Sequence, residues 1–184
     1  MLGLVVFSFV WTAQEPVSLN RPPGGATTTT ACPCVREALH SFARQGDVAH
    51  SKLAGPFVSS SAPLTGVHVR SDSAPSVFKE LSFVRPCSVV IHLTKPIKDV
   101  EELKKVLQFP FSQSRCVVWV ADVNLLSQVL NPLKELFEDN TLRGIRIVPS
   151  GKKGFLILVS EKSREELKEE LPHRVVHMLN TVEL

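Results

Sequence analysis

The sequence predicts an α+β fold for residues 77–184, a two-layer sandwich with a mixed sheet, preceded by a long irregular extension over residues 1–76. Serine, threonine, proline, glycine and alanine make up half of residues 1–76, and only four side chains there are acidic. Such a segment has little apolar surface to offset the entropy of ordering. From residue 77 onward, apolar runs alternate with charged amphipathic segments, and about 108 residues suffice for one compact core.

The composition of the 184-residue chain excludes several classes of protein. Apolar residues make up 43% and charged residues 21%, which is typical of a soluble globular domain and argues against wholesale disorder or a coiled coil. Four cysteines are too few for a disulfide scaffold. No apolar run approaches the ~20 residues of a transmembrane helix. The net charge of +3 is only mildly basic.

The extension has the composition of an organellar targeting segment. Its first residues, Leu2 to Trp11, are apolar, and a stretch follows that is rich in serine, threonine and alanine, poor in acids and dotted with arginines. This combination favours a mitochondrial transit peptide, with a secretion signal or a plain extension as alternatives. Within it, residues 35–45 predict one short amphipathic helix, which would need a surface to dock on.

The first half of the domain alternates strands with a helix. Residues 77–84 alternate apolar and polar side chains, which predicts a short strand, and β-branched residues predict a stronger one over 88–93. Asp99 with Glu102 three positions later has the spacing of a capping box, so a helix is expected from there to Pro110. Residues 116–121 are apolar on both faces, as in a central strand.

The second half predicts helices around a hairpin. A helical stretch over 125–138 should restart at Pro132, with Asn131 as its N-cap. Residues 145–147 and 155–159 flank a loop over 149–153 that suggests a hairpin. Ser163 with Glu166 begins a last helix, which Pro172 should bend or split. The expected order is therefore β-α-β-α-β-β-α.

Few residues suggest chemistry. Cys32 and Cys34 flank a single proline, but their spacing and their surroundings do not fit a redox or zinc motif, so a redox protein is a third-ranked alternative. Cys87 and Cys116 are expected to be buried, and His173 with His177 to face solvent. No nucleophile, base and acid form a recognisable set. The sequence therefore predicts no catalysis, cofactor, metal or small-molecule substrate.

Cations cluster around the expected hairpin. Such a cluster can bind phosphates, giving salt-dependent affinity for nucleic acid, or it can keep an edge strand soluble. Glutamates and aspartates on both sides partly cancel its charge. The candidate nucleic-acid-binding residues are Arg143, Arg146, Lys152, Lys153, Lys162 and Arg164.

Residues 78–160 resemble the C-terminal, ribosome-binding domain of bacterial-type translation initiation factor 3. The segment Phe78 to Pro86 is similar to that domain's opening strand, and the similar spacing continues through residues 102–108, 117–120, 129–131, 145–148 and 155–159. The family places arginines after its second strand, where this chain has Ala121 and Asp122. The resemblance therefore implies RNA contact through Arg146, Lys152 and Lys153.

The same element order also resembles a thioredoxin-like sandwich. The catalytic dithiol of that family would stand at residues 94–96, which are threonine, lysine and proline. This second resemblance implies a non-catalytic relative of the kind found as accessory subunits in mitochondrial ribosomes and respiratory complexes.

These observations lead to two functional hypotheses. The first is a non-catalytic, ribosome-associated binding protein of mitochondrial translation, which contacts ribosomal RNA or protein. The alternative is an accessory subunit of a mitochondrial respiratory or ATP synthase membrane complex, which makes only protein contacts. In both, the partner is a large protein or ribonucleoprotein assembly.

Overall fold

The computed structural model describes residues 53, 55–56, 60–81 and 88–184, and the fold is given for these. The expected helix over 35–45 lies outside them. The α+β class is confirmed, because the described residues form a five-stranded sheet with helices packed on it. In chain order the elements are β1 (Leu64–Arg70), α3 (Ala74–Glu80), β2 (Val89–Leu93), α4 (Val100–Gln108), η2 (Phe109–Ser112), β3 (Cys116–Asp122), η3 (Val123–Val129), α5 (Pro132–Asp139), β4 (Thr141–Leu142), β5 (Ile145–Arg146), β6 (Lys153–Ser160), α6 (Arg164–Glu170), α7 (His173–Met178) and β7 (Asn180–Glu183).

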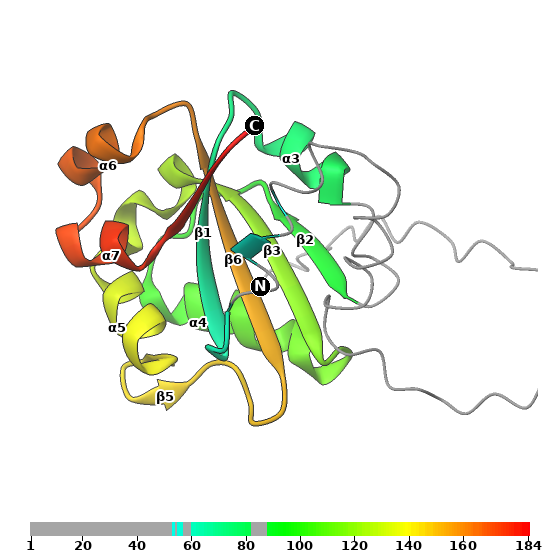
Figure 1. The fold of residues 1–184 in the computed structure, drawn as a ribbon. Coiled ribbons are helices and arrows are strands. Elements are labelled where there is room, and N and C mark those ends of the chain that lie inside the picture. The colour runs from blue at the N-terminus through cyan, green and yellow to red at the C-terminus, as the bar shows by residue number, and fades with distance from the viewer. Residues whose placement is uncertain (1–52, 54, 57–59, 82–87) are drawn as a thin grey trace, which may run out of the picture. The chain divides into compact units, whose positions relative to one another are not determined.

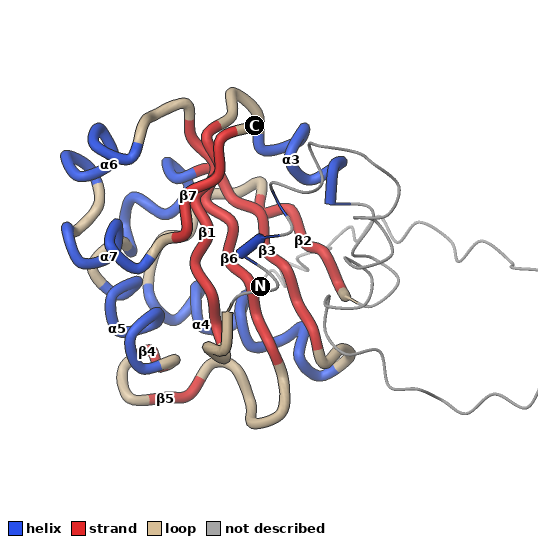
Figure 2. The backbone as a smooth tube through the Cα atoms, in the orientation of Figure 1, coloured by secondary structure: helices blue, strands red, loops and turns tan. Residues whose placement is uncertain are grey.

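The strands of the sheet lie side by side in the order β2-β3-β6-β1-β7 (Figure 2). All four pairings are parallel, so the expected mixed sheet is corrected to a parallel one. The amino ends of the strands lie at the lower edge in Figure 1, near β5, and the carboxyl ends at the upper edge. We call these the amino edge and the carboxyl edge.

The expected hairpin around residues 149–153 is wrong, because the chain turns earlier. Thr141–Leu142 pairs antiparallel with Ile145–Arg146 in a separate two-stranded ribbon. Arg143 and Gly144 between them have φ values of 52° and 73°, the left-handed conformations of a tight two-residue hairpin turn. The loop over 149–153 then leads to the amino edge, where β6 enters between β3 and β1.

The sheet is covered on both faces, so a third, thin layer is added to the two that were predicted. Side chains alternate along a strand. Trp119 and Leu156 therefore face one cluster, with α4 to α7, while Val118 and Ile157 face the other, with α3. Figure 1 shows α5, α6 and α7 on one side of the sheet and α3 on the other. The central position predicted for residues 116–121 is confirmed.

Most helix boundaries agree with the predictions. Asp99 caps α4 by accepting from the amide of Glu102, and Ser163 with Glu166 forms a complete capping box at α6. Pro172 separates α6 from α7, and α5 begins at Pro132. Asn131 stands at the N-cap position of α5, as predicted, but its backbone is helical and its side chain makes no capping bond.

The strand predicted over 77–84 is wrong where the structure describes it. Ser73 accepts a hydrogen bond from the amide of Ser76, and Pro75 occupies the first turn, so residues 74–80 form helix α3. Val77 is fully buried on the inner side of this helix. A short helix and a short strand give similar apolar patterns over so few residues.

Two strands of the sheet were not predicted. β1 lies within the segment assigned to the extension, and its pairing with β6 and β7 moves the start of the folded domain to residue 64 or earlier. β7 follows α7 directly, after the last helix that was predicted. Both strands contain polar residues, and β1 is buried because it lies between β6 and β7, whereas only Val182 of the edge strand β7 is buried.

Within the described part of the chain, no helix is both long enough and apolar enough to cross a bilayer.

Candidate nucleic-acid interface

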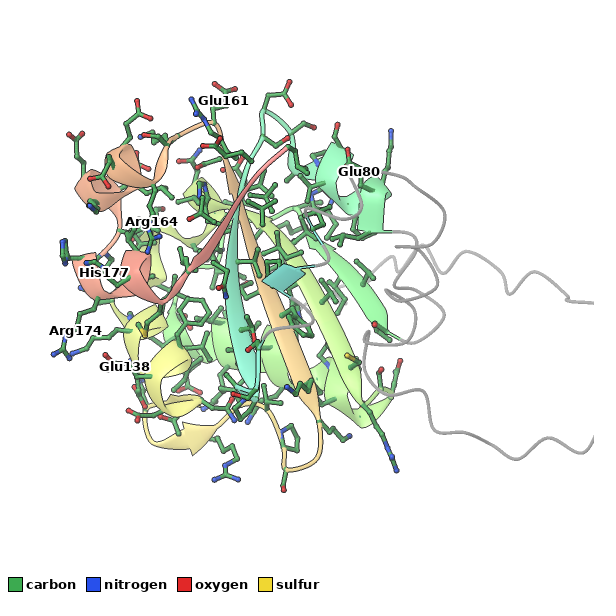
Figure 3. All side chains as sticks on the ribbon, viewed as in Figure 1. Glu80, Glu138, Glu161, Arg164, Arg174 and His177 are labelled. Atoms are coloured by element: carbon green, nitrogen blue, oxygen red, sulfur yellow. The ribbon has the colours of Figure 1, made fainter. Side chains whose placement is uncertain are left out.

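The six predicted cations do not form one cluster. Lys152 and Lys153 stand at the start of β6, whereas Lys162 and Arg164 follow its end. Eight residues of strand separate the two groups by roughly 26 Å. Figure 3 shows Arg164 beside α7, away from the β5 hairpin, and its guanidinium donates to the carbonyl of Val176 at 3.4 Å.

The amino edge gathers the other four cations and adds a fifth. Arg143 and Arg146 lie on the β4–β5 hairpin, and the sequence reasoning missed Arg115, which immediately precedes β3. The backbone amide of Lys153 donates to the carbonyl of Arg115 at 2.9 Å, so the starts of β3 and β6 are adjacent. We call Arg115, Arg143, Arg146, Lys152 and Lys153 the basic edge. Arg115 belongs to the basic edge only because β3 and β6 are neighbours in the sheet.

A groove of about 410 Å³ runs along the basic edge. Arg146, Lys152 and Lys153 line it, and Asp139 is the one carboxylate among its lining residues. Among the residues that the structure describes, no carboxylate forms an ion pair with these three cations. Their positive charge therefore faces the groove without direct neutralisation.

The two lysines are held in place by backbone carbonyls. The ammonium of Lys153 donates to the carbonyl of Ser60 at 2.9 Å, and that of Lys152 donates to the carbonyl of Phe111. A carbonyl is neutral, and an ammonium has three donors. Each lysine thus keeps its full charge and has further N–H groups for a ligand.

The groove wall depends on Asn140. Its side chain is buried and forms two hydrogen bonds with Val148: the amide nitrogen donates to the carbonyl, and the amide oxygen accepts from the backbone N–H, both at 2.9 Å. Asn140 also ends α5 in the left-handed conformation, with φ of 57°. It therefore fixes the turn from α5 into the hairpin and the loop that carries Lys152.

Glu135 fixes the other side of the hairpin. Its carboxylate accepts from the amides of Gly144 at 2.9 Å and Arg143 at 3.0 Å, and from the hydroxyl of Thr141 at 2.7 Å. These bonds, led by the one from Gly144, lower the pKa of Glu135. The Arg143 guanidinium lies 3.6 Å from the Glu101 carboxylate, so the charge of Arg143 is partly neutralised.

Two large apolar side chains are exposed beside the basic edge. Phe109 is 56% exposed and Ile145 is 47% exposed. The amide of Gln108, next to Phe109, donates to the carbonyl of Arg146, next to Ile145, at 2.9 Å. Cations interleaved with an exposed aromatic ring are typical of surfaces that bind nucleic acid.

The carboxyl edge has the opposite charge. A cavity of about 240 Å³ lies there, lined by Ser71, Asp72, Asp122, Val123, Asn124, Ser160, Glu161, Lys162 and Glu170. Lys162 pairs with Glu170, so its charge is neutralised. Lys162, which was predicted to bind nucleic acid, therefore lies among carboxylates that would repel a phosphate.

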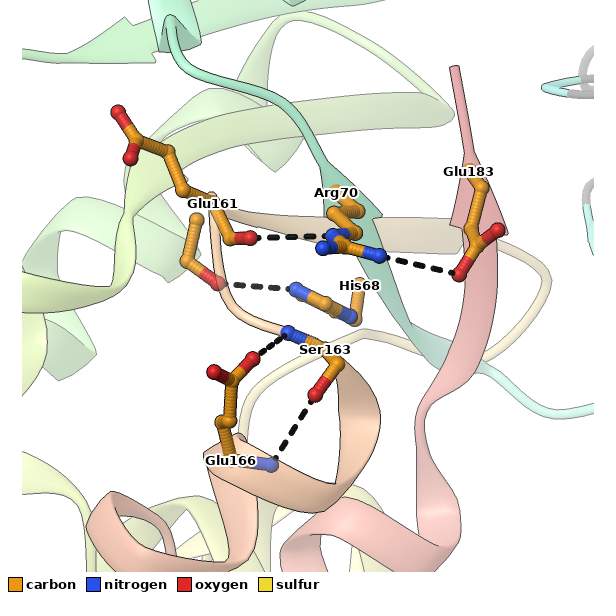
Figure 4. Close-up of polar contacts among 7 residues, drawn as sticks. His68, Arg70, Glu161, Ser163, Glu166 and Glu183 are labelled. Carbon is orange, nitrogen blue, oxygen red and sulfur yellow. Dashed lines mark hydrogen bonds and ion pairs between the residues drawn. The ribbon is translucent and has the colours of Figure 1, made fainter.

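A buried histidine lies at the same edge. Nε2 of His68 lies 3.0 Å from the hydroxyl of Ser160. Close by, Arg70 donates to the carbonyl of Glu161 at 3.1 Å (Figure 4). Burial, and then the charge of Arg70, lower the pKa of His68 to about 4, so the ring is neutral at pH 7. Its Nδ1 has no hydrogen-bond partner among the described groups. Among the described groups, none therefore orients this ring in the way that a third group orients a catalytic base.

The burial of the cysteines and the exposure of the paired histidines were also predicted from the sequence. Cys116 is buried, and His173 and His177 are both exposed on α7 with ring centroids 4.5 Å apart, as predicted. In the described ranges, no three histidine, cysteine or acidic side chains gather as metal ligands. Cys32, Cys34 and Cys87 lie outside the described residues.

No protein-family model matches this chain, and no curated protein is significantly similar to it.

Proposed function

We propose that this protein is a non-catalytic binding protein that contacts RNA in a ribonucleoprotein assembly, with the mitochondrial ribosome as the leading candidate. The observation that carries the proposal is the groove in which Arg146, Lys152 and Lys153 face one carboxylate, Asp139. The phosphodiester backbone of RNA complements such a groove in charge. Each phosphate that a cation neutralises releases a condensed counterion, and this release favours binding.

The charges at the two edges of the sheet indicate which edge would face the RNA. The carboxyl edge, where parallel sheets usually hold small ligands, is lined by Asp72, Asp122, Glu161 and Glu170. The amino edge carries Arg146, Lys152 and Lys153, which form no ion pair with the carboxylates of the described residues. RNA would therefore approach the amino edge, and the acidic carboxyl edge would point away from it.

The organelle assignment has a separate basis. It rests on the composition of residues 1–76, which are rich in serine, threonine and alanine and poor in acids. Fractionation of cells that express the full chain with a C-terminal tag tests it. Recovery in the cytosol or the secretory pathway would contradict the mitochondrial part of the proposal and leave the RNA-binding part standing.

The decisive experiment is sedimentation of the tagged chain from gently lysed organelles, with and without RNase. We expect co-migration with a ribosomal subunit that RNase abolishes. Migration with a membrane complex that RNase does not affect would contradict the proposal and favour the accessory-subunit alternative.

Two charge-reversal variants, one in the groove and one outside it, test where the protein contacts RNA. Arg146→Glu should weaken binding of a labelled oligoribonucleotide by about tenfold. The slope of the logarithm of the binding constant against the logarithm of the salt concentration should become shallower by the amount that about one phosphate contact contributes. The matched control is Lys98→Glu, an exposed cation just before α4 that does not line the groove. Equal effects of the two variants would contradict a specific contact at the basic edge.

A further inference from the structure

We infer that a pocket beside β7 binds a small oxyanion, a carboxylate or a phosphate, and that this site is independent of the proposed RNA contact. The pocket has a volume of about 640 Å³. Arg164 lines it from the start of α6, His177 lines it from the last turn of α7, and all four residues of β7 line it too. Figure 3 shows the side chains of Arg164 and His177 on the same side of the molecule. None of these residues lines the groove of the basic edge.

The guanidinium of Arg164 supplies charge and hydrogen-bond donors. In the part of the chain that the structure describes, it makes one long hydrogen bond, to the carbonyl of Val176 at 3.4 Å, and it forms no ion pair. A guanidinium has five N–H groups in a planar fork that matches a carboxylate or a phosphate. His177, which is exposed on the same wall, adds a ring N–H donor.

Two carboxylates near Arg164 have cations of their own. Glu165 follows Arg164 in the chain, and its carboxylate lies 2.6 Å from the ammonium of Lys168. Glu183 is the one carboxylate among the described residues that line the pocket, and it lies 3.7 Å from the guanidinium of Arg70 (Figure 4). Arg164 therefore gives the pocket a positive charge that one small anion would neutralise.

Thr181 adds a buried hydroxyl to the pocket. Its Oγ1 has no hydrogen-bond partner among the described groups. His68 of β1 is the register partner of Thr181 in a parallel pairing, so the two side chains lie on the same face, and Nδ1 of His68 is buried without a partner as well. Such atoms are uncommon in folded proteins and call for a group that the protein itself does not supply. Rotation of Thr181 to another staggered rotamer would direct Oγ1 into the pocket that Thr181 lines.

Size and charge identify the class of ligand. A pocket of this volume suits a small molecule. A guanidinium, an imidazole and a hydroxyl can all donate, so the complementary group carries acceptor oxygens and a negative charge. A polyanion such as RNA would also meet Glu165 and Glu183, whereas a single carboxylate or phosphate can contact Arg164 alone. A small organic acid or a phosphorylated small molecule therefore fits the pocket best.

An NMR titration of the full chain tests the site. We would add inorganic phosphate, or acetate, to isotope-labelled protein at constant ionic strength, with chloride as the balancing ion. We expect saturable shifts of the amide resonances of Arg164 and of β7. Arg164→Gln should weaken this binding by about tenfold. The matched control is Arg174→Gln, an exposed arginine of α7 that pairs with Glu138 and does not line the pocket, and its binding should equal that of the wild type (Figure 3).

Thr181→Val tests the hydroxyl with a readout that a purely structural role would not give. Valine has a similar shape and replaces the unpartnered hydroxyl with a methyl group, so the melting temperature of the free protein should stay equal or rise. The affinity for the anion should nevertheless fall by roughly threefold, because one hydrogen bond to the ligand is lost. Thr181→Ser keeps the hydroxyl and should keep the affinity.

Each outcome supports or overturns the inference. Saturable binding of phosphate or of acetate supports the site, and the anion that binds identifies the class of ligand. No saturable shift at β7 with either anion would overturn it, and so would equal losses in Arg164→Gln and Arg174→Gln. A lower melting temperature of Thr181→Val would show that the hydroxyl has a partner in the fold and would overturn its role. Arg146→Glu, which tests the RNA contact, should leave these shifts unchanged, so the two proposals can fail separately.

Discussion

Nε2 of His68 lies 3.0 Å from Oγ of Ser160, and this contact joins β1 and β6 at the carboxyl edge of the sheet. The two residues are 92 positions apart in the chain and become neighbours only because β1 and β6 pair in parallel. His68 is fully buried, and the burial keeps its ring neutral. The stability of the domain should therefore depend on pH through this ring.

The first prediction is a loss of stability in mild acid. The pKa of His68 is about 4 in the folded state and about 6.5 in the unfolded chain, so the unfolded state binds the proton first as the pH falls. His68 should therefore cost stability between about pH 6.5 and 4, with no further loss below. We expect a loss on the order of 1–2 kcal/mol, allowing for solvent near the Ser160 side. Denaturant unfolding at several pH values measures it.

The control for this prediction is His68→Gln, whose amide can still bond to Ser160 and does not titrate. Burial also lowers the pKa of His92, which therefore contributes in the same direction and remains in the variant. If the variant shows the full loss between pH 6.5 and 4, another group is responsible.

The second prediction concerns Asn140, the buried side chain that fixes the groove wall. Asn140→Ala removes both hydrogen bonds to Val148 and leaves the backbone of Val148 without its partner. It also places alanine at a φ of 57°, which alanine disfavours. We expect a loss of about 2–3 kcal/mol in the free energy of unfolding, measured by denaturant titration.

Two variants separate these causes. Asn140→Gly accepts the left-handed conformation and loses only the hydrogen bonds, so it should be less destabilised than Asn140→Ala. Asn140→Asp retains the acceptor for the Val148 amide and loses the donor. Equal stability of the glycine and alanine variants would show that the conformation contributes nothing.

The third prediction tests the contact of β1 with the helical layer. A Cβ added at Gly66 would lie 2.6 Å from Cδ2 of Leu179 and 2.9 Å from the ring of Phe137. Leu179 can rotate away, but the ring of Phe137 packs against the core and cannot move freely. We expect Gly66→Ala to reduce stability by about 1–3 kcal/mol, seen as a lower melting temperature. Gly55→Ala is the control, because a Cβ there would meet nothing within 4 Å.

The sequence predicts the helix boundaries well because they depend on neighbouring residues. The caps at Asp99 and Ser163 and the breaks at Pro132 and Pro172 are set within one turn of helix, and the structure confirms all four. The missing side-chain cap at Asn131 has a local cause too. The preceding η3 is already helical up to Val129, so Asn131 continues the turn instead of capping a new one.

The candidate site was predicted only in part. Four of its five cations were named from the sequence, because they cluster around one loop. Arg115 and Phe109 were missed, since they reach the basic edge through the register of β3 against β6 and through the contact of Gln108 with Arg146. Lys162 and Arg164 were grouped with the cations for their closeness in sequence, yet an eight-residue strand carries them to the other edge.

The sequence by itself determined the class of fold, the central position of residues 116–121 and the places where helices start and stop. These properties follow from side-chain periodicity and from hydrogen bonds between residues a few positions apart. The tertiary structure alone decided the strand order, the parallel pairing, the inclusion of β1 and β7 in the sheet and the separation of a basic edge from an acidic one. Those properties arise from pairings between residues up to 114 positions apart, as between Asn180 and Gly66, and no local pattern records them.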